Sequence, residues 1–280
     1  MTELEKKSHR EHTMFGNLIE SYVNIPSGRL NYIAFGMGQK DLIIIQGLNV
    51  RDLKGAGASL ALMYKKFAKK YRVWFFDRRI AVEDGLTNWD LAKDIGDAMD
   101  ALRIDSADVL GVSQGGMIAL ALTLEQPDRI NRLVLGVTAA RANETIKKVV
   151  GRWISCARKQ DHVTINQETF LLMYTEAYLK KYKPLMPLLI RMIKPKDFGR
   201  FAILASAILE FDCYNRLSEI HCPVLVLGGA QDKITTGEAS IEIAQALNCG
   251  LHLYPNYGHA AYEEAKDFND RVYDFLVKQI

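Results

Sequence analysis

Short apolar runs alternate with longer amphipathic segments along most of the chain. The run Asp41–Gln46 is almost continuously apolar, which is typical of a strand buried on both faces. The segment 60–71 that follows is predicted to be a helix whose apolar face carries Leu60, Leu62, Met63 and Phe67. Repeated alternation of strand and helix predicts a parallel sheet wound with right-handed crossovers.

Turn and capping signals mark the limits of these elements. Pro26-Ser27-Gly28 separates two strands and predicts a hairpin. The stretch from Thr87 to Asp90 resembles a capping box, with Asp in place of Glu, and predicts a helix start. The predicted strands of this half are 18–25, 29–35, 41–46, 72–76, 107–112 and 132–137, and the predicted helices are 60–71, 87–102 and 116–125.

The alternation stops after residue 140 and resumes at Pro223. Between these points only helices are predicted, near 144–158, 167–182, 184–193 and 197–211, and strands return at 223–228 and 251–254, with helices at 238–247 and 261–278. We therefore predict an α/β fold with a mostly parallel, twisted sheet of roughly eight strands. Residues 15–140 and 216–280 form its core, 141–215 an inserted all-helical cap, and 1–14 a mobile N-terminal extension.

Composition and charge narrow the range of functions. The 280 residues carry a net charge of +3 without a basic run, so we expect no nucleic-acid partner. There is no long apolar span, and the polar segment 1–12 does not read as a signal peptide, so we expect no membrane association and a cytoplasmic protein. The cysteines show no C-x-x-C pair and are interpreted as reduced structural thiols, which leaves no predicted metal site; they are Cys156, Cys213, Cys222 and Cys249.

The stretch 109–116 carries the candidate nucleophile. An apolar strand runs through a G-x-S-x-G turn, with Ser113 at its centre, into a helix. Such a turn lifts the hydroxyl clear of the backbone at the carboxyl edge of the sheet, where ligands bind in open α/β folds, and Gly111 and Gly115 avoid clashes there. An ordinary helix N-cap is the alternative interpretation of Ser113.

A serine nucleophile needs a base and an acid that orients the base. Asp232 and His259 each follow a predicted strand, so both are expected at the same sheet edge as Ser113. Taken singly, Asp232 could cap a turn and His259 could be a loop residue. The competing acid is Asp212, which follows a cap helix, and the competing histidines are His9, His12, His162, His221 and His252, none of which follows a strand at this edge.

The tetrahedral intermediate also needs donors for its oxyanion. The backbone N–H of Gln114, next to the nucleophile, is one predicted donor. The backbone N–H of Leu48, in the loop after the strand 41–46, is the other. Asn49 could add a side-chain contact, although it is more simply a polar loop residue.

These residues resemble the α/β-hydrolase superfamily, in the branch with a helical cap between the sixth and seventh strands. The superfamily uses the chain order Ser, Asp, His. Segments 113–119 and 133–138 look most like enol-lactone hydrolases and related carboxylesterases. The resemblance implies that the cap covers the site and shapes the substrate pocket. It runs from about Leu18 to Ile280 and rests on Gln46-Gly47, Asp77-Arg78-Arg79, Gly111–Gly116, Pro127-Asp128-Arg129, Leu133–Gly136, Pro223–Asp232 and Gly258-His259.

Two departures from that pattern concern the substrate. Gln46-Gly47 stands where relatives usually have His-Gly, which leaves the backbone donor unaffected. The segment 80–84 replaces a glycine-rich loop that borders the site in relatives, so their substrates do not transfer directly. Arg78 and Arg79 could hold an anionic substrate, but structural ion pairing is the favoured interpretation.

The leading hypothesis is a serine hydrolase without cofactor that cleaves a small carboxylic ester or lactone through an acyl-enzyme. In it Ser113 attacks the carbonyl carbon, His259 takes the proton, and Asp232 orients the imidazole. The same residues could instead act on an amide or on a carbon–carbon bond next to a ketone. A receptor-like binding protein with little turnover is the alternative of another class. Substrate identity and the choice between monomer and homodimer stay open.

Overall fold

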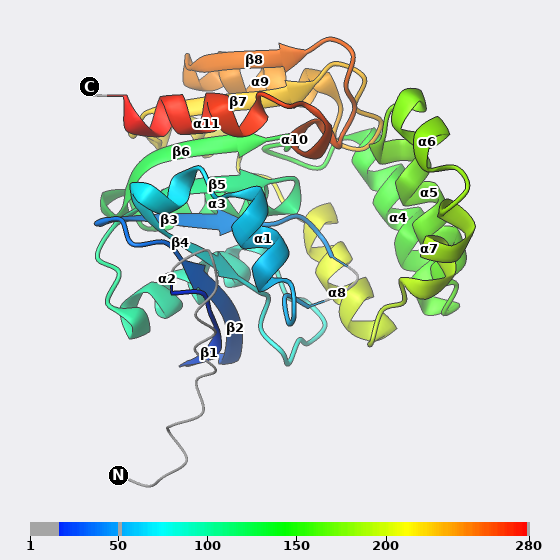
Figure 1. Ribbon diagram of the computed structural model, residues 1–280, viewed down its shortest axis with the longest axis horizontal. Coiled ribbons are helices and arrows are strands. Elements are labelled where there is room, and N and C mark those ends of the chain that lie inside the picture. The colour runs from blue at the N-terminus through cyan, green and yellow to red at the C-terminus, as the bar shows by residue number, and fades with distance from the viewer. Residues whose placement is uncertain (1–16, 50–51, 279–280) are drawn as a thin grey trace, which may run out of the picture.

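The protein is described by a computed structural model that covers residues 17–49 and 52–278. Within these residues eight strands form a single sheet, with helices on both faces (Figure 1). The extension predicted over 1–14 lies outside the described residues. The strands are β1 (Ile19–Ile25), β2 (Gly28–Phe35), β3 (Lys40–Ile45), β4 (Tyr71–Phe76), β5 (Ala107–Val112), β6 (Ile130–Gly136), β7 (Val224–Gly229) and β8 (Gly250–Tyr254).

The strand order in the sheet is β1-β2-β4-β3-β5-β6-β7-β8. β1 pairs antiparallel with β2, β2 pairs antiparallel with β4, and all other neighbours are parallel. The mostly parallel α/β fold and the hairpin at Ser27 are therefore confirmed. The chain turns to opposite sides of β3 when it forms β4 and β5, and ligands bind at the carboxyl ends of strands beside such a switch point.

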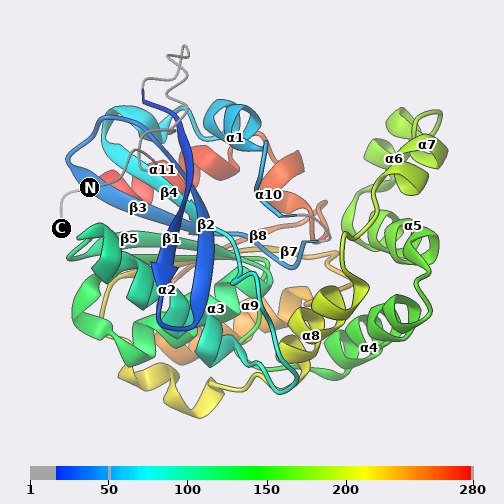
Figure 2. The same ribbon diagram turned by 90° about the horizontal axis from the view of Figure 1, so that it is seen from below.

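Helices cover the two faces of the sheet in separate layers (Figure 2). α1 (Gly57–Met63) and α11 (Phe268–Val277) lie on one face, and α2 (Asn88–Leu102), α3 (Gln114–Glu125) and α9 (Gly237–Leu247) lie on the other. All six residues of β5 are buried, as expected of a central strand covered on both sides. The capping box predicted at Thr87 is present and starts α2.

Five helices lie beyond the carboxyl ends of the strands (Figure 1), between β6 and β7 in the chain. They are α4 (Glu144–Arg158), α5 (His162–Met173), α6 (Glu176–Tyr182), α7 (Met186–Met192) and α8 (Phe198–Leu209). α4 packs against α8 and α5, and buries Val150 and Ile154. The segment 141–215, which contains these five helices, is called the cap.

Three predicted helices are wrong in extent. The helix predicted over 167–182 is two helices, because Tyr174 is extended and the Thr175 side chain caps α6 by accepting a hydrogen bond from the Tyr178 N–H. α5 also starts earlier than predicted, at an N-cap formed by the Asp161 side chain. Capping at an internal Thr is easily missed when both flanking segments have helical periodicity.

The helix predicted over 60–71 ends at Met63, and a 3-10 turn follows at Phe67–Lys69. Tyr71 instead starts β4, where its buried hydroxyl donates to Asp108 Oδ2 at 2.7 Å. The helix predicted over 261–278 is also divided, into α10 (Ala261–Glu264) and α11. Ala265 is extended between them, and this break lets Phe268 bury against the sheet. Among the described residues, no helix combines the length and apolar character that crossing a bilayer requires.

Candidate active site

Ser113 occupies the sharp turn between β5 and α3. Its φ of 55° and ψ of −126° are unusual for a residue with a side chain, and such conformations cost of order 1–3 kcal/mol. The neighbouring glycines make the turn possible: a Cβ on Gly115 would lie 1.9 Å from the carbonyl oxygen of Ile45, and one on Gly111 would lie 2.5 Å from the carbonyl oxygen of Gly115. The predicted strand–turn–helix context of Ser113 is therefore present.

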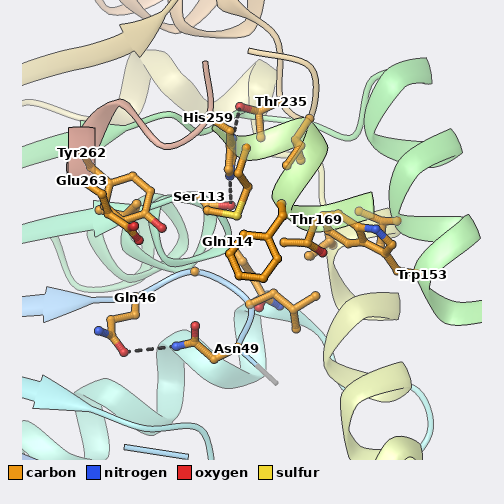
Figure 3. Close-up of a pocket in the computed structure, with 18 of the residues that line it drawn as sticks. Gln46, Asn49, Ser113, Gln114, Trp153, Thr169, Thr235, His259, Tyr262 and Glu263 are labelled. Atoms are coloured by element: carbon orange, nitrogen blue, oxygen red, sulfur yellow. Dashed lines mark hydrogen bonds between the residues drawn. The ribbon is translucent and has the colours of Figure 1, made fainter. Parts of the chain in front are cut away.

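His259 links Ser113 to Asp232. Its Nε2 lies 2.9 Å from Ser113 Oγ, and its Nδ1 lies 2.8 Å from Asp232 Oδ2. Figure 3 shows the imidazole between Ser113 and the loop that carries Thr235. His259 and Asp232 are both buried, so water competes little for these hydrogen bonds. The structure thus brings the three predicted residues into one hydrogen-bonded chain.

The loop after β7 holds Asp232 in the ionised form. Its Oδ1 accepts hydrogen bonds from the N–H groups of Ile234 at 2.7 Å and Thr235 at 3.0 Å. Burial by itself acts to raise the pKa of Asp232, but the attraction of His259 and the hydrogen bonds from His259, Thr235 and Ile234 outweigh it. The pKa of Asp232 is therefore held below its ordinary value, as a group that stabilises an imidazolium requires.

Thr235 is a residue of this site that the sequence patterns did not reveal. Its buried hydroxyl lies 2.7 Å from Asp232 Oδ2 and 3.0 Å from the carbonyl oxygen of Val137. A hydroxyl has one proton, and the shorter distance favours donation to the carboxylate. The cap is joined to the same loop, since Asn143 Nδ2 donates to the carbonyl oxygen of Thr235 at 2.9 Å. The D-x-x-T spacing, which suits side-chain capping of a turn, is the signal that could have revealed Thr235.

The two predicted oxyanion donors border Ser113: Leu48 lies in the loop after β3, and Gln114 lies at the start of α3. A Cβ on Gly47 would lie 3.1 Å from Ser113 Cβ, so the loop after β3 packs directly against the nucleophile. Gln114 is the first residue of α3, and its N–H therefore lacks an intrahelical partner. The side-chain amide of Asn49 is already hydrogen-bonded, because its Nδ2 donates to Gln46 Oε1 at 3.1 Å (Figure 3).

Arg78 and Arg79 both bind partners within the protein. Arg78 is buried, its Nη2 donates to the carbonyl oxygen of Gln46 at 2.5 Å, and burial lowers its pKa to about 10, so it stays charged near neutral pH. Arg79 forms an ion pair with Asp94, at 2.6 Å between Nε and Oδ2. These contacts support structural pairing over binding of an anionic substrate. The alternative acid Asp212 is exposed and accepts a hydrogen bond from the Tyr214 N–H.

A cavity of about 310 Å³ opens at Ser113 and His259. Its walls come from the loop after β3, the start of α3, the cap helices and α10, and they are mostly apolar. Figure 3 shows Tyr262 and Glu263 on one side of Ser113 and Trp153 and Thr169 on the other. Within residues 17–49 and 52–278, no three His, Cys, Asp or Glu side chains are grouped so as to hold a metal ion.

Comparisons with known proteins agree with this fold. A family model described as "alpha/beta hydrolase fold" matches residues 50–164. The crystal structure of the enol-lactonase from Burkholderia xenovorans LB400 superposes with a TM-score of 0.81 at 25% identity, covering 92% of this chain and all of that one. The chain has the α/β-hydrolase fold. Its fold resembles that of the enol-lactone hydrolases, as the sequence motifs indicated.

Two curated relatives match this α/β-hydrolase along most of their length. The putative carbamate hydrolase RutD of Caulobacter sp. (strain K31) is 29% identical over 236 residues, which cover 80% of this chain and 87% of the relative. The 3-oxoadipate enol-lactonase 2 of Acinetobacter baylyi is 27% identical over 263 residues, which cover 86% of this chain and 94% of the relative. Both relatives are hydrolases by name, which supports the assignment of this chain as an α/β-hydrolase.

Proposed function

We propose that this α/β-hydrolase cleaves a small carboxylic ester or lactone through an acyl-enzyme formed on Ser113. The observation that carries the proposal is the chain of hydrogen bonds from Asp232 through His259 to Ser113, which ends at the wall of the cavity. A serine hydroxyl is a weak nucleophile unless a base takes its proton. His259 Nε2 lies 2.9 Å from Ser113 Oγ, within reach of that proton.

In the first half of the reaction, Ser113 Oγ attacks the carbonyl carbon while its proton passes to His259 Nε2. The carbonyl oxygen becomes an oxyanion, which the N–H groups of Leu48 and Gln114 stabilise. His259 then donates its proton to the leaving alkoxide, the carbon–oxygen bond breaks, and the acyl group stays on Ser113. In a lactone the leaving hydroxyl remains attached to the acyl group.

In the second half, a water molecule attacks the acyl carbon while His259 Nε2 takes its proton. The tetrahedral intermediate collapses, the proton returns to Ser113 Oγ, and the acid is released. The carboxylate of Asp232 keeps a proton on Nδ1 through the 2.8 Å contact, so that Nε2 is the nitrogen free to act. Thr235 and the N–H groups of the Asp232 loop keep that carboxylate ionised and oriented.

The substrate is small, because the cavity of about 310 Å³ is at the lower end for drug-sized ligands. A carbamate or an amide is the second candidate, supported by the similarity to a protein named as a carbamate hydrolase. Two alternative functions use the same cavity. One is cleavage of a carbon–carbon bond next to a ketone, and the other is receptor-like binding with little turnover. The free thiols of the described residues also suit the predicted cytoplasmic location.

The test is a panel of short-chain esters, lactones and carbamates given to the parent protein, Ser113→Ala and Ser218→Ala. Ser218 is exposed and lies outside the cavity lining, so its replacement is a matched control. With the esters and carbamates we expect a burst of the leaving alcohol equal to the protein concentration, followed by steady turnover, in the parent and in Ser218→Ala. Equal turnover by Ser113→Ala would exclude the mechanism. Binding of a lactone without turnover would favour the receptor-like function.

A further inference from the structure

The charge of the cavity wall suggests which substrates it accepts. Among the described residues that line the cavity, none is Lys, Arg or Asp, and Glu263 is the single acidic side chain. Two guanidinium groups of the described residues, those of Arg78 and Arg200, line a separate small pocket that shares the Gln46–Asn49 loop with the cavity. Both side chains already form hydrogen bonds within the protein. Arg78 donates to the carbonyl oxygen of Gln46, and Arg200 donates to the carbonyl oxygens of Arg78 and Arg79.

Glu263 lies on α10, at one side of the cavity (Figure 3). It is exposed, which places its carboxylate where the cavity meets solvent. Tyr174 of the α5–α6 break donates its hydroxyl to Glu263 Oε2 at 2.6 Å and so fixes the carboxylate beside the cavity. Tyr64 and Tyr262 also line the cavity. A carboxylate among aromatic faces repels an anion and suits a cationic or neutral group.

The other polar groups of the wall are uncharged. The indole N–H of Trp153 is buried and has no hydrogen-bond partner among the described residues, although Trp153 lines the cavity. A buried, unpaired donor favours an acceptor supplied by a ligand. Asn166 is already used, because its Nδ2 donates to the carbonyl oxygen of Ile190 at 2.8 Å. A neutral donor such as Trp153 Nε1 suits a carbonyl or ether oxygen, but it cannot neutralise a carboxylate.

We propose that the cavity selects esters or lactones that carry no carboxylate, and that Glu263 is a specificity-determining residue that rejects anionic substrates. The inference rests on the proposed function and specifies its substrate class: neutral substrates, or substrates with a positively charged group near α10. A carboxylate bound against the described lining residues, which include no Lys or Arg, loses its hydration and gains no cationic partner from them. An uncharged substrate chain binds against the same wall without this loss of carboxylate hydration.

The test compares substrates of matched length. They are the 4-nitrophenyl esters of hexanoic acid, of adipic acid, which carries a terminal carboxylate, and of 6-(trimethylammonio)hexanoic acid. Phenyl acetate and 4-carboxyphenyl acetate place the charge on the alcohol side instead. For the parent protein we expect kcat/KM for each carboxylate to be at least about a hundredfold below that of its neutral match. The ammonium ester should stay within about tenfold of the hexanoate, because its charge faces Glu263 rather than an apolar wall.

Glu263→Gln removes the negative charge and keeps the shape of the side chain. We expect it to raise kcat/KM for the adipate ester about three- to tenfold relative to the hexanoate, and the rise should diminish at high salt. Glu210→Gln is the matched control, because Glu210 is exposed and does not line the cavity, and it should leave the ratio unchanged. Carboxylate esters cleaved as well as their neutral matches, or an unchanged ratio in Glu263→Gln, would overturn the proposal.

A binding measurement separates this inference from the proposed function. Ser113→Ala is titrated with hexanamide and with adipic acid monoamide, and its thermal stabilisation is followed. Stabilisation by hexanamide alone supports the charge selection even if no ester is turned over, in which case only the proposed function fails. Equal stabilisation by the two amides contradicts the charge selection even if the esters are cleaved.

Discussion

Arg78 Nη2 donates a hydrogen bond to the carbonyl oxygen of Gln46 at 2.5 Å, and Arg78 itself lines a neighbouring small pocket rather than the cavity. The contact holds the peptide that leads into Gly47 and Leu48, and this loop carries one of the two proposed oxyanion donors. We therefore assign Arg78 as a positioning residue, although it does not touch the substrate.

Replacing Arg78 should lower the rate more than the affinity. A hydrogen bond from a charged group contributes about 1.5–3 kcal/mol, so we expect Arg78→Met to reduce kcat about tenfold to a hundredfold with little change in KM. Arg78→Lys should restore part of the loss, because it keeps the charge but not the fork of donors. Thermal unfolding of both variants shows whether they fold. A loss confined to KM, or a loss fully explained by unfolding, would contradict the positioning role.

The Thr235 hydroxyl is expected to act through Asp232. Thr235→Val keeps the shape of the side chain but leaves Oδ2 without its 2.7 Å partner, and we expect kcat to fall about tenfold with KM unchanged. Thr235→Ser keeps the hydroxyl and should behave like the parent. Steady-state kinetics on a neutral ester measure both variants. A Ser variant as impaired as the Val variant would assign the effect to packing instead.

The conformation of Ser113 predicts a conflict between stability and activity. Glycine tolerates a φ of 55° without the strain that a side chain imposes, so we expect Ser113→Gly to be about 1 kcal/mol more stable than Ser113→Ala. The two variants lose the same contact to His259, which makes them a matched pair. Both should be inactive. Urea unfolding measures the difference, and a Gly variant less stable than the Ala variant would show that the turn is not strained.

The depressed pKa of Asp232 predicts how stability depends on pH. A carboxylate with a folded-state pKa below its unfolded value stabilises the folded protein above the unfolded pKa, and this stabilisation is lost as the pH falls through the folded pKa. Asn cannot titrate, so the difference in unfolding free energy between the parent and Asp232→Asn should shrink as the pH falls from about 5 to about 3. Asp84→Asn, at an exposed loop position, should show no such trend. A constant difference for Asp232→Asn over this range would contradict the assignment.

The sequence was most informative where a function depends on local chain geometry. The apolar run of β5 and the glycines around Ser113 specify a strand, a tight turn and a helix within a few residues. Because Asp232 and His259 each follow a strand of a parallel sheet, their approach to Ser113 also follows from the strand pattern. These are the features that the structure brings together.

The sequence was least informative where partners are distant in the chain. Periodicity cannot show that Arg78 reaches the carbonyl of Gln46, or that Tyr174 of the cap reaches Glu263 of α10, because these contacts depend on how separate elements pack. The break at Thr175 was missed for a related reason. It is stabilised by Glu264, whose carboxylate accepts hydrogen bonds from the Thr175 N–H and hydroxyl. Substrate preference depends on the same packing, so it could not be derived from local patterns.

The most direct test of the proposed nucleophile is the site and rate of labelling by a fluorophosphonate probe, followed by mass spectrometry of the digested protein. We predict one label per chain, attached to Ser113, absent in Ser113→Ala, and formed at least about a hundredfold more slowly in His259→Ala. Ser218→Ala should label like the parent. A label on another residue, or a His259→Ala variant that reacts as fast as the parent, would contradict the claim that His259 activates Ser113.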